Sequence, residues 1–143
     1  MTIELRVKNS GLVPRTYKEE GERGSLFAAE DPHIPFSIRR MYVISGVDKG
    51  VTRGDHAHKK TDQVMFVVQG ELTLHLDDGE TKQSIRLTSR DEGIRLAPML
   101  WHYMSDFTPD CMALVAASLP YNESDYIRDY EEFKKYARTL NLR

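Results

Sequence analysis

Apolar and polar residues alternate along residues 2–7 and 71–76, which is the pattern of a strand with one buried face. Residues 64–68 form a short, continuous apolar run, which indicates a strand buried on both faces. Further extended segments are predicted at 36–45, 81–87, 94–97, 101–107 and 112–118. Turn-forming residues separate these segments every 8–12 positions, so the chain is predicted to be an all-β barrel or sandwich.

Two regions depart from this rhythm. The segment from Asn9 to Pro35 is polar and rich in Gly and Pro, so we expect a loop-dominated arm with one short strand at 25–28. From Ser124 to Leu140 the spacing becomes helical, and acidic residues precede basic ones as the helix dipole favours. We predict a short C-terminal helix whose packing face is Tyr126, Tyr130, Phe133 and Ala137.

Length and charge limit the classes of protein to which the chain can belong. The 143 residues suit one domain, 1–143, and a net charge of −2 gives no basic footprint for nucleic acid or an anionic membrane. No apolar run approaches membrane-spanning length, and the first residues lack the apolar core of a signal peptide. We expect a cytoplasmic protein. Its single cysteine, Cys111, excludes an internal disulfide.

The triplet His56-Ala57-His58 is the strongest candidate for chemistry. In an extended segment, alternate side chains point to the same face, so both imidazoles are expected on one side of the strand. Two neighbouring imidazoles can bind a metal or share proton transfer.

The residues around the triplet resemble the first signature of the cupin superfamily. Five residues separate Gly50 from His56, four separate His58 from Gln63, and six separate Gln63 from Gly70. Metal-binding cupins have a glutamate ligand at the position of Gln63, and a neutral amide is a much poorer donor to a cation. We therefore expect no metal and no other cofactor.

Three segments resemble one branch of that superfamily, the sugar nucleotide 3,4-ketoisomerases or WxcM-like cupins. They are 53–59, 98–102 and 121–133, and the resemblance extends from about Val13 onwards. It implies a metal-free jelly-roll homodimer that moves the ketone of dTDP-4-keto-6-deoxyglucose from C4 to C3, on the route to 3-amino sugars. The histidine pair of the family corresponds to His56 and His58.

The chemistry suits imidazole. The C4 ketone acidifies the hydrogen on C3, so a base of near-neutral pKa can remove it and leave an enediolate. Imidazole can then return a proton to C4. We favour His58 as the base at carbon and His56 as the proton carrier at the oxygens, although strand alternation alone cannot order the two.

Other candidates have donors near the motif strands. The enediolate needs donors or positive charge, for which the catalytic candidates are Tyr42, His102 and Tyr103. Arg53 lies just before the histidines, and its guanidinium suits a phosphate, with Arg39 or Arg40 as the second cation. Further substrate-binding candidates are Lys59, Trp101 and Arg128, which lie in the resembling segments, and Gln63, which lies in the first cupin signature. His33 and His75 lie outside any motif and are expected to have surface or structural roles.

Three alternatives remain open at this point. They are a 3,5-epimerase of the same substrate, a metal-binding cupin with His56, His58 and His102 as ligands, and a non-catalytic sugar-binding cupin. The expected homodimer would exchange N-terminal strands, because the arm before Pro35 is long for so small a barrel. Such an exchange would bury Ile3, Leu5 and Val7 in the partner.

Overall fold

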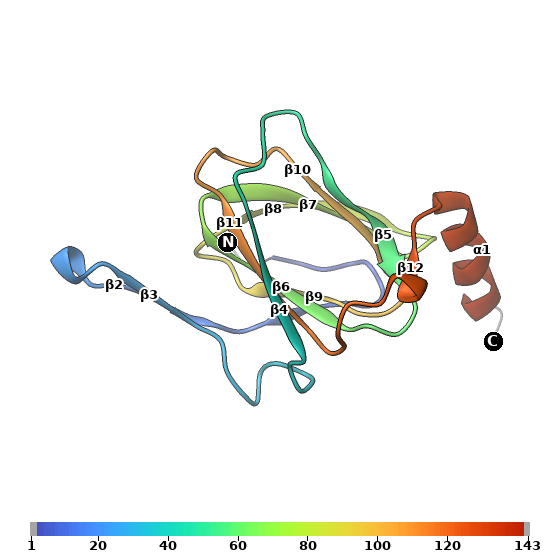
Figure 1. Ribbon diagram of the computed structural model, residues 1–143, viewed down its shortest axis with the longest axis horizontal. Helices are drawn as coiled ribbons and strands as arrows, with labels where there is room; N and C mark the ends of the chain where they lie inside the picture. Colours follow the sequence, from blue (N-terminus) through green and yellow to red (C-terminus); the bar gives the residue numbers. More distant parts are fainter. Residues whose placement is uncertain (1–2, 142–143) are drawn as a thin grey trace.

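Two antiparallel five-stranded sheets face each other in the computed structural model, which describes residues 3–141 (Figure 1). One sheet has the order β1-β9-β6-β11-β4 and the other has the order β12-β5-β10-β7-β8. The strands are β1 (Ser10–Val13), β4 (Arg40–Ser45), β5 (Arg53–His58), β6 (Gln63–Gln69), β7 (Glu71–Asp77), β8 (Lys82–Thr88), β9 (Gly93–Leu96), β10 (Trp101–Ser105), β11 (Met112–Ala117) and β12 (Tyr126–Ile127). The all-β prediction is confirmed, and each extended segment predicted from 36 onwards contains a strand.

The main core lies between the two sheets. Leu72, Leu74 and Leu76 alternate inward from β7 and are at most 1% exposed, as the period of two predicts. β6 is buried on both faces over most of its length, because the opposite sheet covers one face and the segment leading into β4 covers the other. This rigid pair of layers holds the side chains that point into the barrel.

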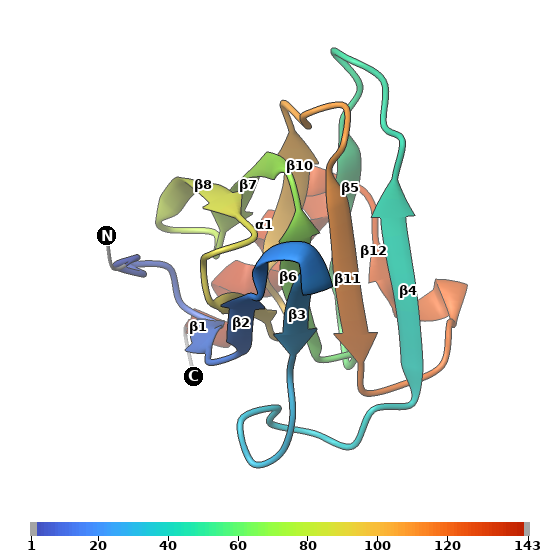
Figure 2. The same cartoon turned by 90° about the vertical axis from the view of Figure 1, so that its left-hand side faces the viewer.

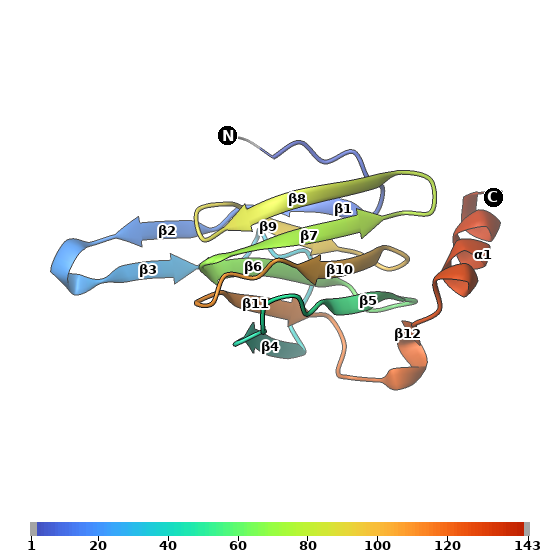
Figure 3. The ribbon, with the colours of Figure 1, turned by 90° about the horizontal axis from the view of Figure 1, so that it is seen from above.

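Helix α1 (Tyr130–Asn141) covers the outer face of β5 and β10 at one end of the barrel (Figures 1 and 3). Phe133 and Ala137 pack there against Ala57 and Trp101. Their expected packing role is therefore confirmed.

The helix begins later than the predicted 124. The Asp129 carboxylate accepts a hydrogen bond from the backbone N–H of Glu132 at 3.0 Å, which caps the helix at this point. Before it come a 3₁₀ turn, η2 (Glu123–Asp125), and then β12. Tyr126 therefore belongs to a strand and not to the helical stripe.

The first residues lie along the edge of β8 without forming the predicted strand. The backbone N–H of Arg6 donates to the side-chain oxygen of Gln83 at 2.9 Å, and the Gln83 amide donates to the Glu4 carbonyl at 2.6 Å. These side-chain bonds replace a backbone ladder. The predicted facing is nevertheless correct, because Ile3, Leu5 and Val7 pack against this chain's own core.

A hairpin of β2 (Thr16–Glu19) and β3 (Ser25–Ala28) projects from the barrel at the end opposite α1 (Figure 3). A 3₁₀ turn, η1 (Gly21–Arg23), joins the two strands. The strand predicted at 25–28 is confirmed, whereas β1 and β2 were not predicted. No helix in the described part of the chain is long and apolar enough to cross a membrane.

Candidate active site

A β-bulge in β5 shapes the floor of the candidate site. Gly54 and Asp55 have φ angles of 97° and 59°, and the pairing with β10 shifts between His102↔His56 and Tyr103↔Gly54. A Cβ atom on Gly54 would lie 2.9 Å from the His102 carbonyl oxygen and 3.0 Å from the Tyr103 Cα atom, so only glycine fits. Beyond the bulge, His56 and His58 point to the same face of β5, as the sequence predicts, and this face points into the barrel.

Three histidines meet inside the barrel. The ring centres of His56 and His58 are 5.0 Å apart, and those of His56 and His102 are 4.8 Å apart. The Tyr126 ring lies 4.8 Å from the His56 ring and 4.3 Å from the His58 ring. Strand β12 thus supplies one wall of the cluster.

Hydrogen bonds fix the position of the proton on two of the three rings, those of His56 and His102. Nδ1 of His56 lies 3.0 Å from the Gly54 carbonyl oxygen, and Nδ1 of His102 lies 3.1 Å from the Leu100 carbonyl oxygen. A carbonyl oxygen only accepts hydrogen bonds, so each Nδ1 carries the proton and each Nε2 keeps its lone pair. Both Nε2 atoms are therefore able to accept a proton.

Burial keeps the three rings neutral. Burial, with a smaller contribution from neighbouring His58, lowers the pKa of His56 to about 4. Burial and His102 lower the pKa of His58 to about 4, although Asp125 acts in the opposite direction. Burial and His56 lower the pKa of His102 to about 3. At neutral pH all three groups are bases in their neutral form.

A cavity of about 260 Å³ opens onto this cluster. Its lining contains His56 and His102, but His58 lies behind the lining, and its Nε2 atom is buried without a hydrogen-bond partner. The other predicted residues that line the cavity are Tyr42, Gln63, Arg40, Arg53 and Arg128. The structure therefore gives His56, and not His58, direct access to a molecule in the cavity.

Asp125, which the sequence analysis did not select, holds His58 from behind. Its carboxylate lies 3.2 Å from Nδ1 of His58 and accepts hydrogen bonds from the backbone of Lys60 and from the backbone and hydroxyl of Thr61. Burial favours the protonated acid, but these hydrogen bonds outweigh it and lower the pKa of Asp125, so the group is ionised. Asp125 thus accepts the Nδ1 proton of His58.

Positive charge dominates the cavity. Arg40, Arg53 and Arg128 line it, and none of the described lining residues is an aspartate or glutamate. The Arg40 guanidinium lies 4.5 Å from the centre of the Tyr42 ring, and that of Arg128 lies 4.4 Å from the centre of the Tyr126 ring. Arg128 also forms a two-point ion pair with Glu123. The cavity therefore suits a ligand that carries both anionic and planar groups.

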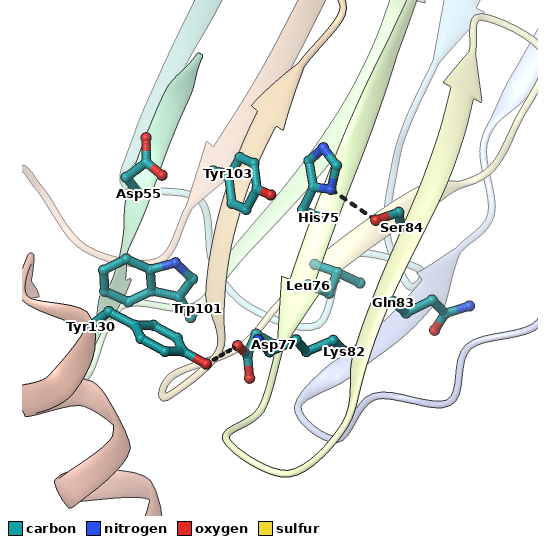
Figure 4. A pocket seen from close by; sticks show the side chains of 10 residues that line it. All are labelled: Asp55, His75, Leu76, Asp77, Lys82, Gln83, Ser84, Trp101, Tyr103 and Tyr130. Carbon is teal, nitrogen blue, oxygen red and sulfur yellow. Dashed lines mark hydrogen bonds between the residues drawn. The ribbon is translucent and has the colours of Figure 1, made fainter.

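Besides His58, four predicted site residues lie outside this cavity. Arg39 and Lys59 are exposed and do not line it, and the Lys59 ammonium lies over the Tyr136 ring instead. Trp101 and Tyr103 point to the opposite face of β10 from His102, where they line a second cavity of about 450 Å³ (Figure 4).

Among the residues that the structure describes, the second cavity offers no free imidazole base. Its one histidine, His75, stacks on Tyr103 with ring centres 4.1 Å apart. Its two ring nitrogens lie 2.8 and 2.7 Å from the hydroxyls of Ser84 and Ser105, so both are engaged. The predicted structural role of His75 matches these contacts, and Trp101 and Tyr103 have no place in the histidine site.

The cluster was also tested as a metal site. One nitrogen each from His56, His58 and His102 lies within 4.8 Å of the others, so the three rings alone have a spacing that a metal ion can use. The surroundings do not fit a cation, because none of the described residues that line the cavity is an anionic ligand and the Gln63 amide donates to Tyr42 at 3.1 Å. We expect less than stoichiometric metal in the purified protein. Elemental analysis tests this, and one ion per chain together with loss of activity on chelation would contradict it.

The fold and this cavity define a jelly-roll protein of the cupin type with a histidine-based site. The family model described as "FdtA: WxcM-like, C-terminal" matches residues 12–138. The chain therefore belongs to the WxcM-like family.

Two groups of relatives agree with this assignment. The chain is 47% identical over 121 residues to the TDP-4-oxo-6-deoxy-α-D-glucose-3,4-oxoisomerase of Aneurinibacillus thermoaerophilus. The aligned residues cover 84% of this chain and 87% of the relative. It is similar to the QdtA 3,4-ketoisomerase of Thermoanaerobacterium thermosaccharolyticum. One variant of that protein in complex with TDP has a TM-score of 0.89 and 37% identity, over 96% of this chain and 100% of the other. Another variant, in complex with TDP-4-keto-6-deoxyglucose, has a TM-score of 0.89 and 34% identity over the same shares.

Proposed function

We propose that the chain is an isomerase that moves the ketone of dTDP-4-keto-6-deoxyglucose from C4 to C3, with a histidine as the base. The substrate is the compound named TDP-4-keto-6-deoxyglucose for its relatives. The observation that carries the proposal is a positively charged cavity with neutral imidazoles at its floor, in a chain of this family. Such a cavity can hold a nucleoside diphosphate and remove a proton from the attached sugar.

His56 is the base at carbon in this proposal, which reverses the order favoured by the sequence. A base must reach the proton that it removes, and His56 lines the cavity with a free Nε2, whereas Nε2 of His58 is buried. His56 takes the proton from C3, and the electron pair of that C–H bond moves into the enediolate. The same imidazole then delivers a proton to C4.

The oxygens require a second proton carrier. Tyr42 lines the cavity, and burial, which is the largest influence, raises the pKa of its phenol, so the group is a neutral donor. It gives its proton to the C4 oxygen of the enediolate, which becomes an enediol, and the resulting phenolate takes the proton of the C3 hydroxyl as the new ketone forms. Arg53 and Arg40 stabilise the negative charge of the enediolate and the diphosphate.

Product analysis tests the function. We expect the purified protein to convert dTDP-4-keto-6-deoxyglucose into the 3-keto isomer, identified by NMR. Inversion at C3 or C5 without movement of the ketone would instead identify a 3,5-epimerase. Binding of the sugar nucleotide without any conversion would identify a non-catalytic binding protein.

Arg53 is expected to hold the diphosphate. Arg53→Ala should weaken binding of dTDP about tenfold, measured by calorimetry, because a charged hydrogen bond to phosphate is lost. Arg39→Ala is the matched control, since Arg39 is also exposed but does not line the cavity. Equal dTDP affinity in Arg53→Ala and the parent protein would remove Arg53 from the diphosphate site.

We also propose a homodimer, but the segment exchanged between its subunits differs from the one expected from the sequence. Ile3, Leu5 and Val7 already pack against their own barrel, so they do not need a partner. The projecting β2–β3 hairpin is the better candidate for exchange (Figure 3). Strand β4 lies at the outer edge of its sheet (Figure 2). Large apolar side chains are also exposed on the hairpin and near β4, namely Leu26, Ile38, Met41, Val43 and Met112.

Light scattering tests the dimer. We expect a mass of about twice the 16.5 kDa of the chain at micromolar concentration, and Val43→Lys should shift it towards the single-chain mass. Val51→Lys is the control, because Val51 is similarly exposed but lies in the loop before β5. A single-chain mass for the parent protein would contradict the dimer. The cytoplasmic location stays a prediction of the sequence.

A further inference from the structure

Gln63 occupies the position at which metal-binding cupins have a glutamate, and the structure gives its amide a contact of its own. The side chain is fully buried at the start of β6 and reaches the cavity wall. Its Nε2 atom donates a hydrogen bond to the Tyr42 hydroxyl oxygen at 3.1 Å, across the two strands that flank β11. A buried amide that contacts a cavity-lining phenol can control that phenol.

The direction of this bond determines where the Tyr42 proton points. A phenol has one proton to donate, and its oxygen can accept a bond from elsewhere. Because the oxygen accepts from Gln63, the O–H bond must point away from the amide. Within residues 3–141, no other protein group is hydrogen-bonded to this hydroxyl. The cavity is then the direction left for the proton.

We propose that Gln63 is a positioning residue that orients the Tyr42 hydroxyl to donate into the cavity. The inference rests on the proposed function, in which Tyr42 serves the sugar oxygens. A glutamate at position 63 would reverse the bond, because a carboxylate accepts a hydrogen bond from the phenol and so turns the phenolic proton away from the substrate. A glutamine at position 63 therefore has two consequences. It removes an anionic metal ligand, and it is required for proton transfer from Tyr42 to the sugar oxygens.

The test is a double-mutant cycle between Gln63→Glu and Tyr42→Phe, with turnover and dTDP affinity measured for each protein. Gln63→Glu should lower kcat about 100-fold, close to the effect of Tyr42→Phe, because both remove one donor to a developing negative charge. The double variant should be no slower than Tyr42→Phe alone, because Gln63 acts only through Tyr42. Affinity for dTDP should change less than twofold in all three proteins. A chelator in every assay prevents the new carboxylate from recruiting a metal.

Two further variants keep the result interpretable. Gln69→Glu makes the same change at the far end of β6, where the Gln69 amide donates to the Asp110 carbonyl at 2.9 Å and kcat should not change. Gln63→Met removes the bond without reversing it, so kcat should fall less than in Gln63→Glu; if Gln63→Glu does not fold, the cycle is run with Gln63→Met.

The inference is overturned if Gln63→Glu retains kcat within twofold, or if the losses of the two single variants multiply in the double variant. Failure of the proposed function would look different, because the parent protein itself would then produce no 3-keto sugar.

Discussion

His56→Asn should lose about 1,000-fold in turnover while retaining its affinity for dTDP. Removal of a general base costs about 10²–10⁴-fold, and no other free imidazole has equal access to the cavity, since His102 is only 3% exposed. Asparagine is close to histidine in size, so the nucleotide contacts remain. Turnover is measured with dTDP-4-keto-6-deoxyglucose, and exchange of the C3 hydrogen is followed by NMR in D₂O. Neither product nor exchange should appear.

His58→Asn is the matched comparison within the same triplet. Asparagine can still donate to Asp125, which keeps the buried contact. His56 remains intact in this variant, so the C3 hydrogen should still exchange slowly even where turnover falls. If His58→Asn abolished exchange and His56→Asn retained it, the two roles would have to be reversed. Exchange in both variants would place the base elsewhere, with His102 next to test.

Gly54→Ala should damage both the fold and the site. The residue has a φ of 97°, and a Cβ would lie 3.0 Å or less from the backbone of β10. We expect the free energy of unfolding to fall by about 2 kcal/mol or more. For a chain of this size, this corresponds to a decrease in Tm of roughly 4–8 °C. Turnover should also fall at temperatures where the variant is folded, because the Gly54 carbonyl orients His56.

Gly50→Ala separates the effect of backbone strain from the effect of a steric clash with β10. Gly50 has a similar φ of 84°, but within residues 3–141 nothing apart from its chain neighbours lies within 4 Å of the position that its Cβ would take. This variant should lose some stability and keep its turnover. Equal stability and equal activity in Gly54→Ala and Gly50→Ala would show that the close approach to β10 has no role in the site.

Strand alternation predicted much of the fold and part of the site. The period of two placed His56 and His58 on one face and separated His102 from Trp101 and Tyr103, as the structure confirms. Those two aromatic residues were nevertheless selected as candidates, because the sequence does not say which face of β10 points inward. Had His102 been used to fix the inward face, the same pattern would have excluded both.

Contacts between residues far apart in the chain could not be predicted from the sequence. Asp125 lies 67 residues from His58, and nothing in the local pattern links them. Tyr126 was assigned to the helix because its spacing to Tyr130 is helical, whereas Asp129 starts the helix later and β12 turns the Tyr126 ring towards the histidines. The order of His56 and His58 also depends on depth in the barrel, which alternation does not encode.

The most direct test of the proposed function is to run the reaction of the parent protein in D₂O. Because the base that lines the open cavity can exchange with solvent between its two proton transfers, the 3-keto product should carry deuterium at C4, detected by NMR. An unmoved ketone, or deuterium at C5 in place of C4, would contradict a 3,4-isomerisation through an enediolate.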